Sequence, residues 1–126
     1  RNPAFDQATK HVPLSASLIT MGEAVMLTAY DDPARGAGKN IGMGYNLSAN
    51  KDNATADLAR AGVPKERVQD VIEGRASLTQ KQAERLLLVA LPRYEKSVKD
   101  TAEGTSPGLW ERMSSTQKAV MVDVAW

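Results

Sequence analysis

The sequence predicts a mixed α and β fold that is mostly helical, and three observations support this prediction. Residues 40–45 (Asn-Ile-Gly-Met-Gly-Tyr) alternate small and apolar residues at period two, as a short strand does. Residues 31–33 (Asp-Asp-Pro) form a turn signal before them. We therefore expect a small antiparallel β-element between Leu27 and Tyr45. After Asn53, apolar residues recur at helical spacing almost to the end of the chain.

The N-terminal part is expected to begin with a lead-in and continue with a short helix. Residues 1–14 are polar and contain two prolines, which is typical of a linker, and residues 15–126 are taken as one domain. A helix is expected from about Leu18, with a serine cap before it. We expect it to end soon after Glu23, because Gly22 weakens a helix interior by about 1 kcal/mol relative to alanine.

The first helices after Asn53 are predicted from their end signals. Residues 55–62 form one short helix that ends at a glycine, and residues 64–74 form the next, which opens with a proline. Residues 79–82 (Thr-Gln-Lys-Gln) match a capping box and should start a long helix. Pro92 is expected to kink or break this helix, and residues 101–107 should form a loop.

Two more helices are expected near the C-terminal end. Residues 109–113 form a short helix, and the last helix begins at Ser115 or Thr116. Its apolar face is expected to contain Val120, Met121 and Val124. This pattern continues to Trp126 without a closing glycine or proline, so we expect that the domain is truncated at its C-terminal end.

Composition argues against several classes of protein. The chain has 126 residues, 42% hydrophobic and 25% charged, which suits one globular domain. Its formal charge of +1 comes from interleaved basic and acidic residues, and the basic stripe typical of a nucleic-acid partner is missing. No run of apolar residues is long enough to span a membrane. With no cysteine and only His11, no transition-metal site is expected.

Two carboxylates are placed in the sequence so that they could face each other across a cleft, as glycoside hydrolysis requires. Glu23 is expected at a helix end, and Asp32 follows nine residues later on a turn. Hydrolysis needs one carboxyl group to protonate the leaving oxygen and a second to activate water or to stabilise the sugar cation. Spacing alone is a weak argument in a chain with 15 acidic residues.

The segment from Glu23 to Gly44 resembles the signature of bacteriophage-type lysozymes. There a Glu, a Tyr, an Asp, a Gly-rich loop and T-I-G-x-G follow one another in this order. Residues 78–87 (LTQKQAERLL) look like the family's "ITKDEAEKLF" helix start, and residues 109–126 look like its later helix pair. The resemblance implies a lysozyme-like fold, in which a long helix joins a small β lobe to a helical lobe.

The resemblance also implies catalytic roles. Glu23 would be the general acid, and partial burial would raise the pKa of its carboxyl group. Asp32 would position water or support the sugar cation. Asn40 stands where the family has threonine, and its amide could hold the attacking water in a different way.

Substrate contacts are implied for five further residues. The small residues Gly42 and Gly44 would let the backbone pack beneath the saccharide. Tyr30 and Tyr45 could offer flat faces to sugar rings, although Tyr45 replaces a family histidine. Trp126 belongs either to the core or to the cleft wall, and both alternatives stay open.

The expected function is therefore that of a muramidase, without a cofactor. It would cleave the β-1,4 bond between N-acetylmuramic acid and N-acetylglucosamine in peptidoglycan. The resemblance implies a phage-encoded protein that acts in the bacterial periplasm and cell wall, as an endolysin or as part of a larger virion protein. Asn40 leaves two alternatives open: a lytic transglycosylase that yields anhydro-muropeptides, and a non-catalytic wall-binding or structural virion module.

Overall fold

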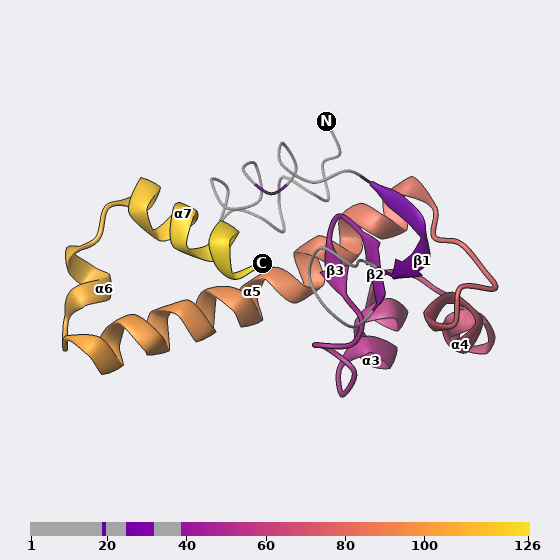
Figure 1. Cartoon of the computed structure of the whole chain (residues 1–126), viewed down its shortest axis with the longest axis horizontal. Coiled ribbons are helices and arrows are strands. Elements are labelled where there is room, and N and C mark those ends of the chain that lie inside the picture. The colour runs from indigo at the N-terminus through magenta and orange to yellow at the C-terminus, as the bar shows by residue number, and fades with distance from the viewer. Residues whose placement is uncertain (1–18, 20–24, 32–38) are drawn as a thin grey trace. The chain divides into compact units, whose positions relative to one another are not determined.

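The computed structural model describes Ile19, residues 25–31 and residues 39–126 (Figure 1). The predictions for the lead-in, the first helix, Glu23 and Asp32 lie outside these residues. The described residues are 59% helical, with one small sheet and one long helix, which confirms the mixed and mostly helical fold class. Among the helices in the described ranges, none combines the length and apolar character that crossing a bilayer requires.

The chain divides into two compact units. Among the described residues, the sheet unit consists of residues 25–31 and 39–89, and the helical unit consists of Ile19 and residues 90–126. The boundary falls inside the long helix α5 (Gln80–Thr105), which contributes its first half to one unit and its second half to the other.

The sheet unit is built on three antiparallel strands. They are β1 (Met26–Asp31), β2 (Lys39–Gly42) and β3 (Tyr45–Asn46), and β2 lies in the middle. Asp31 is the cross-strand partner of Lys39 in the β1–β2 pair. The expected small antiparallel β-element is confirmed.

Residues 40–45 alternate as one short strand does, but within the expected β-element this segment is a hairpin. Strand β2 ends at Gly42, Met43 and Gly44 form the turn, and β3 begins at Tyr45. Gly42 has φ +67° and Gly44 has φ +83°, a left-handed conformation that suits glycine and interrupts an extended strand. The glycines that resembled strand alternation are therefore turn residues.

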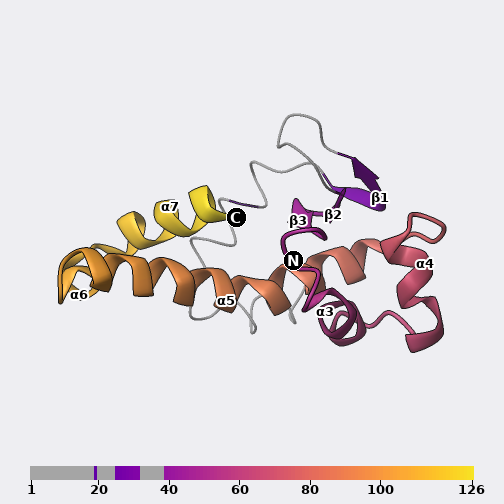
Figure 2. The same cartoon turned by 60° about the horizontal axis from the view of Figure 1, so that its bottom comes forward.

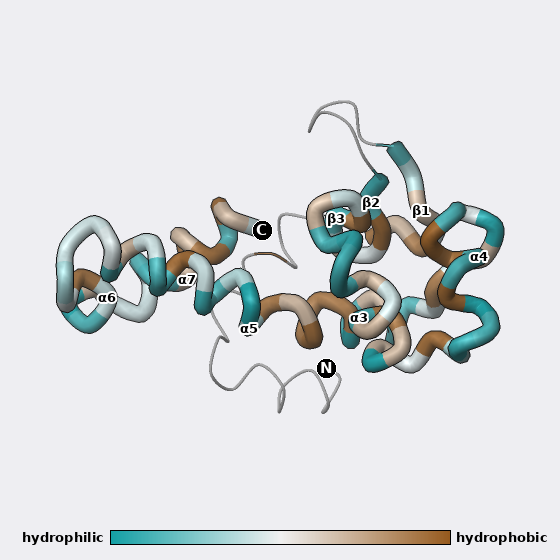
Figure 3. The backbone as a smooth tube through the Cα atoms, turned by 90° about the horizontal axis from the view of Figure 1, so that it is seen from below, coloured by the Kyte–Doolittle hydropathy of each residue, from teal (hydrophilic) through white to brown (hydrophobic). Residues whose placement is uncertain are grey.

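Three short helical segments and the start of α5 complete the sheet unit. These segments are α3 (Ala54–Arg60), the 3-10 helix η2 (Lys65–Arg67) and α4 (Val68–Ile72). Their positions confirm the two short helices that were predicted before α5. The fully enclosed side chains of this core include Ile41, Tyr45, Leu58, Val71 and Leu86. Figure 3 shows the corresponding hydrophobic segments in β2 and along α5.

The capping box before α5 is confirmed. The backbone N–H of Gln82 donates to the Thr79 hydroxyl at 3.1 Å, and the backbone N–H of Thr79 donates to Oε1 of Gln82 at 2.9 Å. These bonds satisfy donors that would otherwise lack partners at the helix start. The Gln82 side chain also donates to the carbonyl of Gly62 at 3.1 Å, which ties α5 to the end of α3.

Helix α5 continues through Pro92, so of the predicted kink or break the break does not occur. A proline inside a helix costs roughly 3 kcal/mol relative to alanine. Pro92 lies on the exposed side, whereas Leu87, Leu91 and Val98 are buried. Burying each such side chain contributes about 1.5–3 kcal/mol, which together exceeds the cost of the proline.

The predicted loop over residues 101–107 was also wrong for its first part, because α5 extends to Thr105. The hydroxyl of Thr101 donates to the carbonyl of Ser97, and that of Thr105 donates to the carbonyl of Thr101, both at 3.0 Å. Helical threonines often form such bonds. Ala102 is buried between them, which anchors this last part of the helix.

The helical unit pairs the second half of α5 with α6 (Leu109–Arg112) and α7 (Ser115–Ala125). Figures 1 and 2 show α7 returning alongside α5 in the opposite direction. Ser114 caps α7 in a second capping box, accepting from the backbone N–H of Gln117 at 3.1 Å. Both predicted C-terminal helices are therefore confirmed.

The expected inward face of α7 was assigned to the wrong side of the helix. Val120, Met121 and Val124 are 46%, 45% and 79% exposed. The buried residues are instead Ala119 and Val122. Because α7 is apolar on two sides, helical spacing alone did not distinguish the side that packs.

Two glycine substitutions should change stability in opposite directions. Gly42→Ala should destabilise the protein by about 1–2 kcal/mol, since alanine disfavours the left-handed conformation. Gly104→Ala should stabilise it by roughly 0.5–1 kcal/mol, because Gly104 lies inside α5 with nothing within 4 Å of an added Cβ. Urea unfolding followed by circular dichroism measures both, and a neutral Gly42→Ala would contradict the backbone argument.

Candidate functional site

The structure places the described candidate residues in two different units. Tyr30, Asn40, Gly42 and Tyr45 lie in the three strands of the sheet unit, and Gly44 lies in the turn between β2 and β3. Trp126 belongs to the helical unit, where its ring lies 4.8 Å from that of Tyr94 and is tilted by 57°. Its side chain is buried, which agrees with the core alternative stated for this residue.

Tyr30 and Asn40 are brought together by the β1–β2 pairing. They are cross-strand partners, and both side chains therefore lie on the same face of the sheet. Tyr30 is half-buried, and Asn40 is 2% exposed on the middle strand. Asn40 therefore does not occupy an exposed sheet edge, and its amide is enclosed next to the half-buried Tyr30 ring.

The Tyr45 ring is enclosed, in contrast to its expected place on a cleft wall. It is 1% exposed, and its hydroxyl donates to Oδ2 of the buried Asp57 at 2.6 Å. A hydroxyl bonded to a carboxylate makes a short and strong hydrogen bond. This bond joins β3 to α3 and gives Tyr45 a structural role, which the sequence motif did not indicate.

Gly42 lies against the start of α5. A Cβ built on Gly42 would meet Ala83 at 3.7 Å and the Leu78 side chain at 3.8 Å, which are ordinary contacts. Its left-handed φ is thus the feature that calls for glycine. Contact of Gly42 or Gly44 with a saccharide stays a prediction.

A groove of about 800 Å³ lies in the sheet unit. We call it the basic groove. It is lined by the end of β1, the start of β2, the segment after β3 and the region around the end of α4: Asp31, Lys39, Leu47, Ser48, Lys51, Ile72, Glu73 and Arg75. Its volume is within the range of small-ligand sites.

Arg75 is engaged on one side of the basic groove. Its guanidinium group forms ion pairs with Asp70, at 2.8 Å, and with Glu73. The hydrogen bonds to Asp70 and Glu73 raise the pKa of Arg75 above its ordinary value. The charge of Arg75 is therefore compensated by its own neighbours.

Lys39 and Lys51 are the cations left for a ligand on the other side of the groove. Within the described ranges, neither ammonium group has an ion-pair partner. The backbone N–H of Lys39 donates to the Ser48 hydroxyl at 3.2 Å, and that of Lys51 donates to the Ser48 carbonyl at 3.4 Å. These bonds hold the two lysine backbones around one serine.

The basic groove and the Tyr30–Asn40 pair lie on opposite faces of the sheet. Successive residues of a strand point to opposite faces. Asp31 and Lys39, which line the groove, each adjoin one member of the Tyr30–Asn40 pair in sequence. The sheet therefore presents two different surfaces at the same strand ends.

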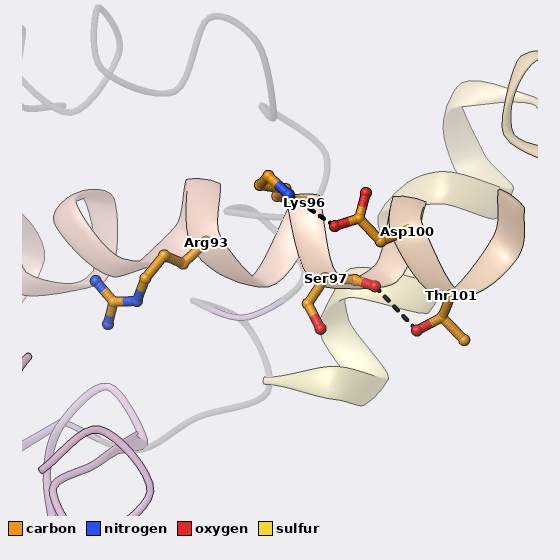
Figure 4. A pocket seen from close by; sticks show the side chains of 5 residues that line it. All are labelled: Arg93, Lys96, Ser97, Asp100 and Thr101. Atoms are coloured by element: carbon orange, nitrogen blue, oxygen red, sulfur yellow. Dashed lines mark hydrogen bonds and ion pairs between the residues drawn. The ribbon is translucent and has the colours of Figure 1, made fainter. Parts of the chain in front are cut away.

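A second depression, of about 430 Å³, lies along α5 in the helical unit (Figure 4). Lys96 forms an ion pair with Asp100 at 2.7 Å, and Thr101 donates to the carbonyl of Ser97. All of its lining residues come from this one helix, and their polar groups largely engage each other. It is therefore a weaker candidate for a ligand site than the basic groove.

Comparisons of the chain with family models, with characterised proteins and with solved structures found no match. The structure itself defines the class, a mixed α and β protein with a small antiparallel sheet and a long helix. In the described part of the chain, no cluster of histidine and acidic residues has the makeup of a metal site. The lysozyme resemblance rests on the sequence motif.

Sequence reasoning missed the basic groove and the Tyr45–Asp57 pair. The groove residues come from four separate segments, and no motif connects them. Asp57 had one usable signal: it occupies the same turn of α3 as the buried Leu58 and Ala54. An acidic residue in such a position requires a polar partner.

The Tyr45–Asp57 hydrogen bond predicts a specific loss of stability. Tyr45→Phe should destabilise the protein by about 1–3 kcal/mol, because the buried carboxylate loses a hydrogen-bond donor. Tyr30→Phe is the matched control, since the Tyr30 hydroxyl forms no hydrogen bond within the described ranges, and a loss of about 0.5 kcal/mol or less is expected. Chemical unfolding measures both, and equal effects would contradict a special role for Tyr45.

Proposed function

We propose that this chain is a peptidoglycan muramidase that cleaves the β-1,4 bond between N-acetylmuramic acid and N-acetylglucosamine. The proposal rests on the Glu23–Gly44 motif, and the observation that supports it most is the β1–β2 pairing. This pairing sets Tyr30 opposite Asn40, although the Gly-rich segment separates them in sequence. A small antiparallel sheet followed by a long helix agrees with the lysozyme-like arrangement that the motif implies.

The chemistry assigns one role to each polar motif residue. Glu23 donates its proton to the glycosidic oxygen as the bond to the sugar C1 breaks. Asp32, which follows Asp31 at the end of β1 in the sequence, activates water or stabilises the positive charge on the sugar. Asn40 can both donate to and accept from a water molecule, and no cofactor takes part.

The enclosed amide of Asn40 favours a second candidate function. If Asn40 holds no attacking water, the 6-hydroxyl of N-acetylmuramic acid attacks its own C1, and the product is an anhydro-sugar. This lytic transglycosylase would still need Glu23 as the acid. Asn40 is 2% exposed, and this burial is the observation that supports the second function.

The setting of this activity is proposed with it. A muramidase of the phage type acts on glycan strands in the periplasm and cell wall, either after release at lysis or as a segment of a larger virion protein. The interleaved charges of the sequence agree with a partner other than nucleic acid.

Mass spectrometry of digested peptidoglycan tests the proposal. Glu23→Gln should lower the rate of muropeptide release by about 10²- to 10⁴-fold, the range that a general acid contributes. Glu66→Gln is the matched control, since Glu66 is exposed in η2, and it should act at the wild-type rate. Products with reducing ends indicate hydrolysis, and anhydro ends indicate transglycosylation.

Loss of this dependence would overturn the proposal. If the folded chain binds peptidoglycan and releases no product that depends on Glu23, the non-catalytic wall-binding module replaces the enzyme. Circular dichroism of Glu23→Gln separates this outcome from a failure to fold.

A further inference from the structure

We propose that the basic groove binds a small phosphorylated amine, with the phosphate at its two lysines and the ammonium group at Asp31. This inference goes beyond the proposed function and does not depend on it. Asp31 and Lys39 line the groove. The motif residues Tyr30 and Asn40 lie on the other face of the sheet, so the binding residues differ from those of the proposed cleavage.

Three donor groups line one side of the groove and suit the three oxygens of a phosphate monoester. The ammonium groups of Lys39 and Lys51 have no ion-pair partner within the described ranges. The Ser48 hydroxyl accepts from the backbone N–H of Lys39 at 3.2 Å, which leaves its own proton to donate. A phosphate group offers three strong acceptor oxygens, one for each of these donors, whereas a carboxylate offers two.

Asp31 supplies the opposite charge beside this anionic end. It lies directly opposite Lys39 in the β1–β2 pair, where Cβ atoms are about 4.5–5.5 Å apart. The two side chains nevertheless form no ion pair with each other or with any other described residue. Both charges are therefore left for a ligand, and a molecule that carries an anion and a cation a short distance apart compensates them together.

The net charge of the lining favours a free monoester. Three basic and two acidic side chains line the groove, which leaves one net positive charge. A phosphate monoester carries about −1.5 to −2 at pH 7, so an ammonium group on the same molecule brings its total close to −1. A phosphodiester of the same amine, as in a lipid headgroup, has no net charge. Leu47 and Ile72 add apolar surface that suits the carbon linker of the ligand.

The experiment titrates the 126-residue chain with O-phosphoethanolamine and, separately, with ethyl phosphate, which lacks the ammonium group. Binding is followed by the amide NMR signals of Lys39, Ser48 and Lys51. The double variant Lys39→Gln/Lys51→Gln should weaken binding of both compounds about fivefold, as expected for the loss of two exposed ion pairs. Lys65→Gln/Lys81→Gln removes the same charge from exposed positions outside the groove and should leave both affinities unchanged.

Asp31→Asn tests the sign of the charge at the other end. It should weaken binding of O-phosphoethanolamine about twofold, because the ammonium group loses its partner. It should tighten binding of ethyl phosphate about twofold, because a negative charge no longer repels the phosphate. A change of both affinities in the same direction would overturn the proposal, as would equal affinities of the double lysine variant and the wild type. The amide signals outside the groove show whether each variant is folded.

Vesicles separate the free monoester from a lipid headgroup. Vesicles of phosphatidylethanolamine and phosphatidylcholine should not sediment the chain at a lipid concentration at which free O-phosphoethanolamine saturates the groove. Sedimentation that Lys39→Gln/Lys51→Gln abolishes would overturn the assignment to a free monoester. None of these measurements uses peptidoglycan, so a failure of the groove proposal is distinct from a failure of the muramidase proposal.

Discussion

The middle strand β2 is the constraint on which the sheet unit depends. It pairs with β1 on one side and β3 on the other, and it has only four residues, each with a different environment. Lys39 lines the basic groove, Asn40 lies on the opposite face, Ile41 is fully buried in the core, and Gly42 lies against Ala83 of α5. A shift of one residue in its register would exchange these environments. The pairing of β2 therefore sets the core and both candidate surfaces at once.

The neighbouring hydrogen bonds hold that register in place. Gly42 and Gly44 both have a positive φ, and the chain reverses direction between β2 and β3, so Tyr45 pairs with Ile41. The Tyr45 hydroxyl then reaches Asp57 on α3. A bond between two buried groups holds its geometry well, since leaving either group without a partner would cost about 1–3 kcal/mol.

Local signals in the sequence predicted much of the fold, and the differences arise where burial decides. The capping box at Thr79 depends on residues three apart, so its hydrogen bonds could be expected from the sequence. Pro92 was expected to kink or break α5; the helix does not break there, because burial of residues on the opposite side outweighs the cost of the proline. The packed side of α7 could not be predicted, because Val120 and Val122 are equally apolar and only tertiary contacts select Val122. The basic groove likewise needs four segments to meet, and no spacing along the chain predicts that.

Side chains on the paired strands β1 and β2 alternate between the two faces of the sheet, and the two faces differ in charge. The proposed acid chemistry needs an enclosed environment in which a carboxyl group can keep its proton, whereas binding of an anion needs lysines that reach solvent. One surface could not meet both needs, because exposed cations nearby would favour loss of the proton from the acid. Tyr30 and Asn40 face one side, and Asp31 and Lys39 face the other, so the three-stranded sheet separates an uncharged surface from a charged one by its own thickness. A single substitution at Lys39 or at Asn40 therefore changes one surface of the sheet and leaves the other, provided that it keeps the strand pairing.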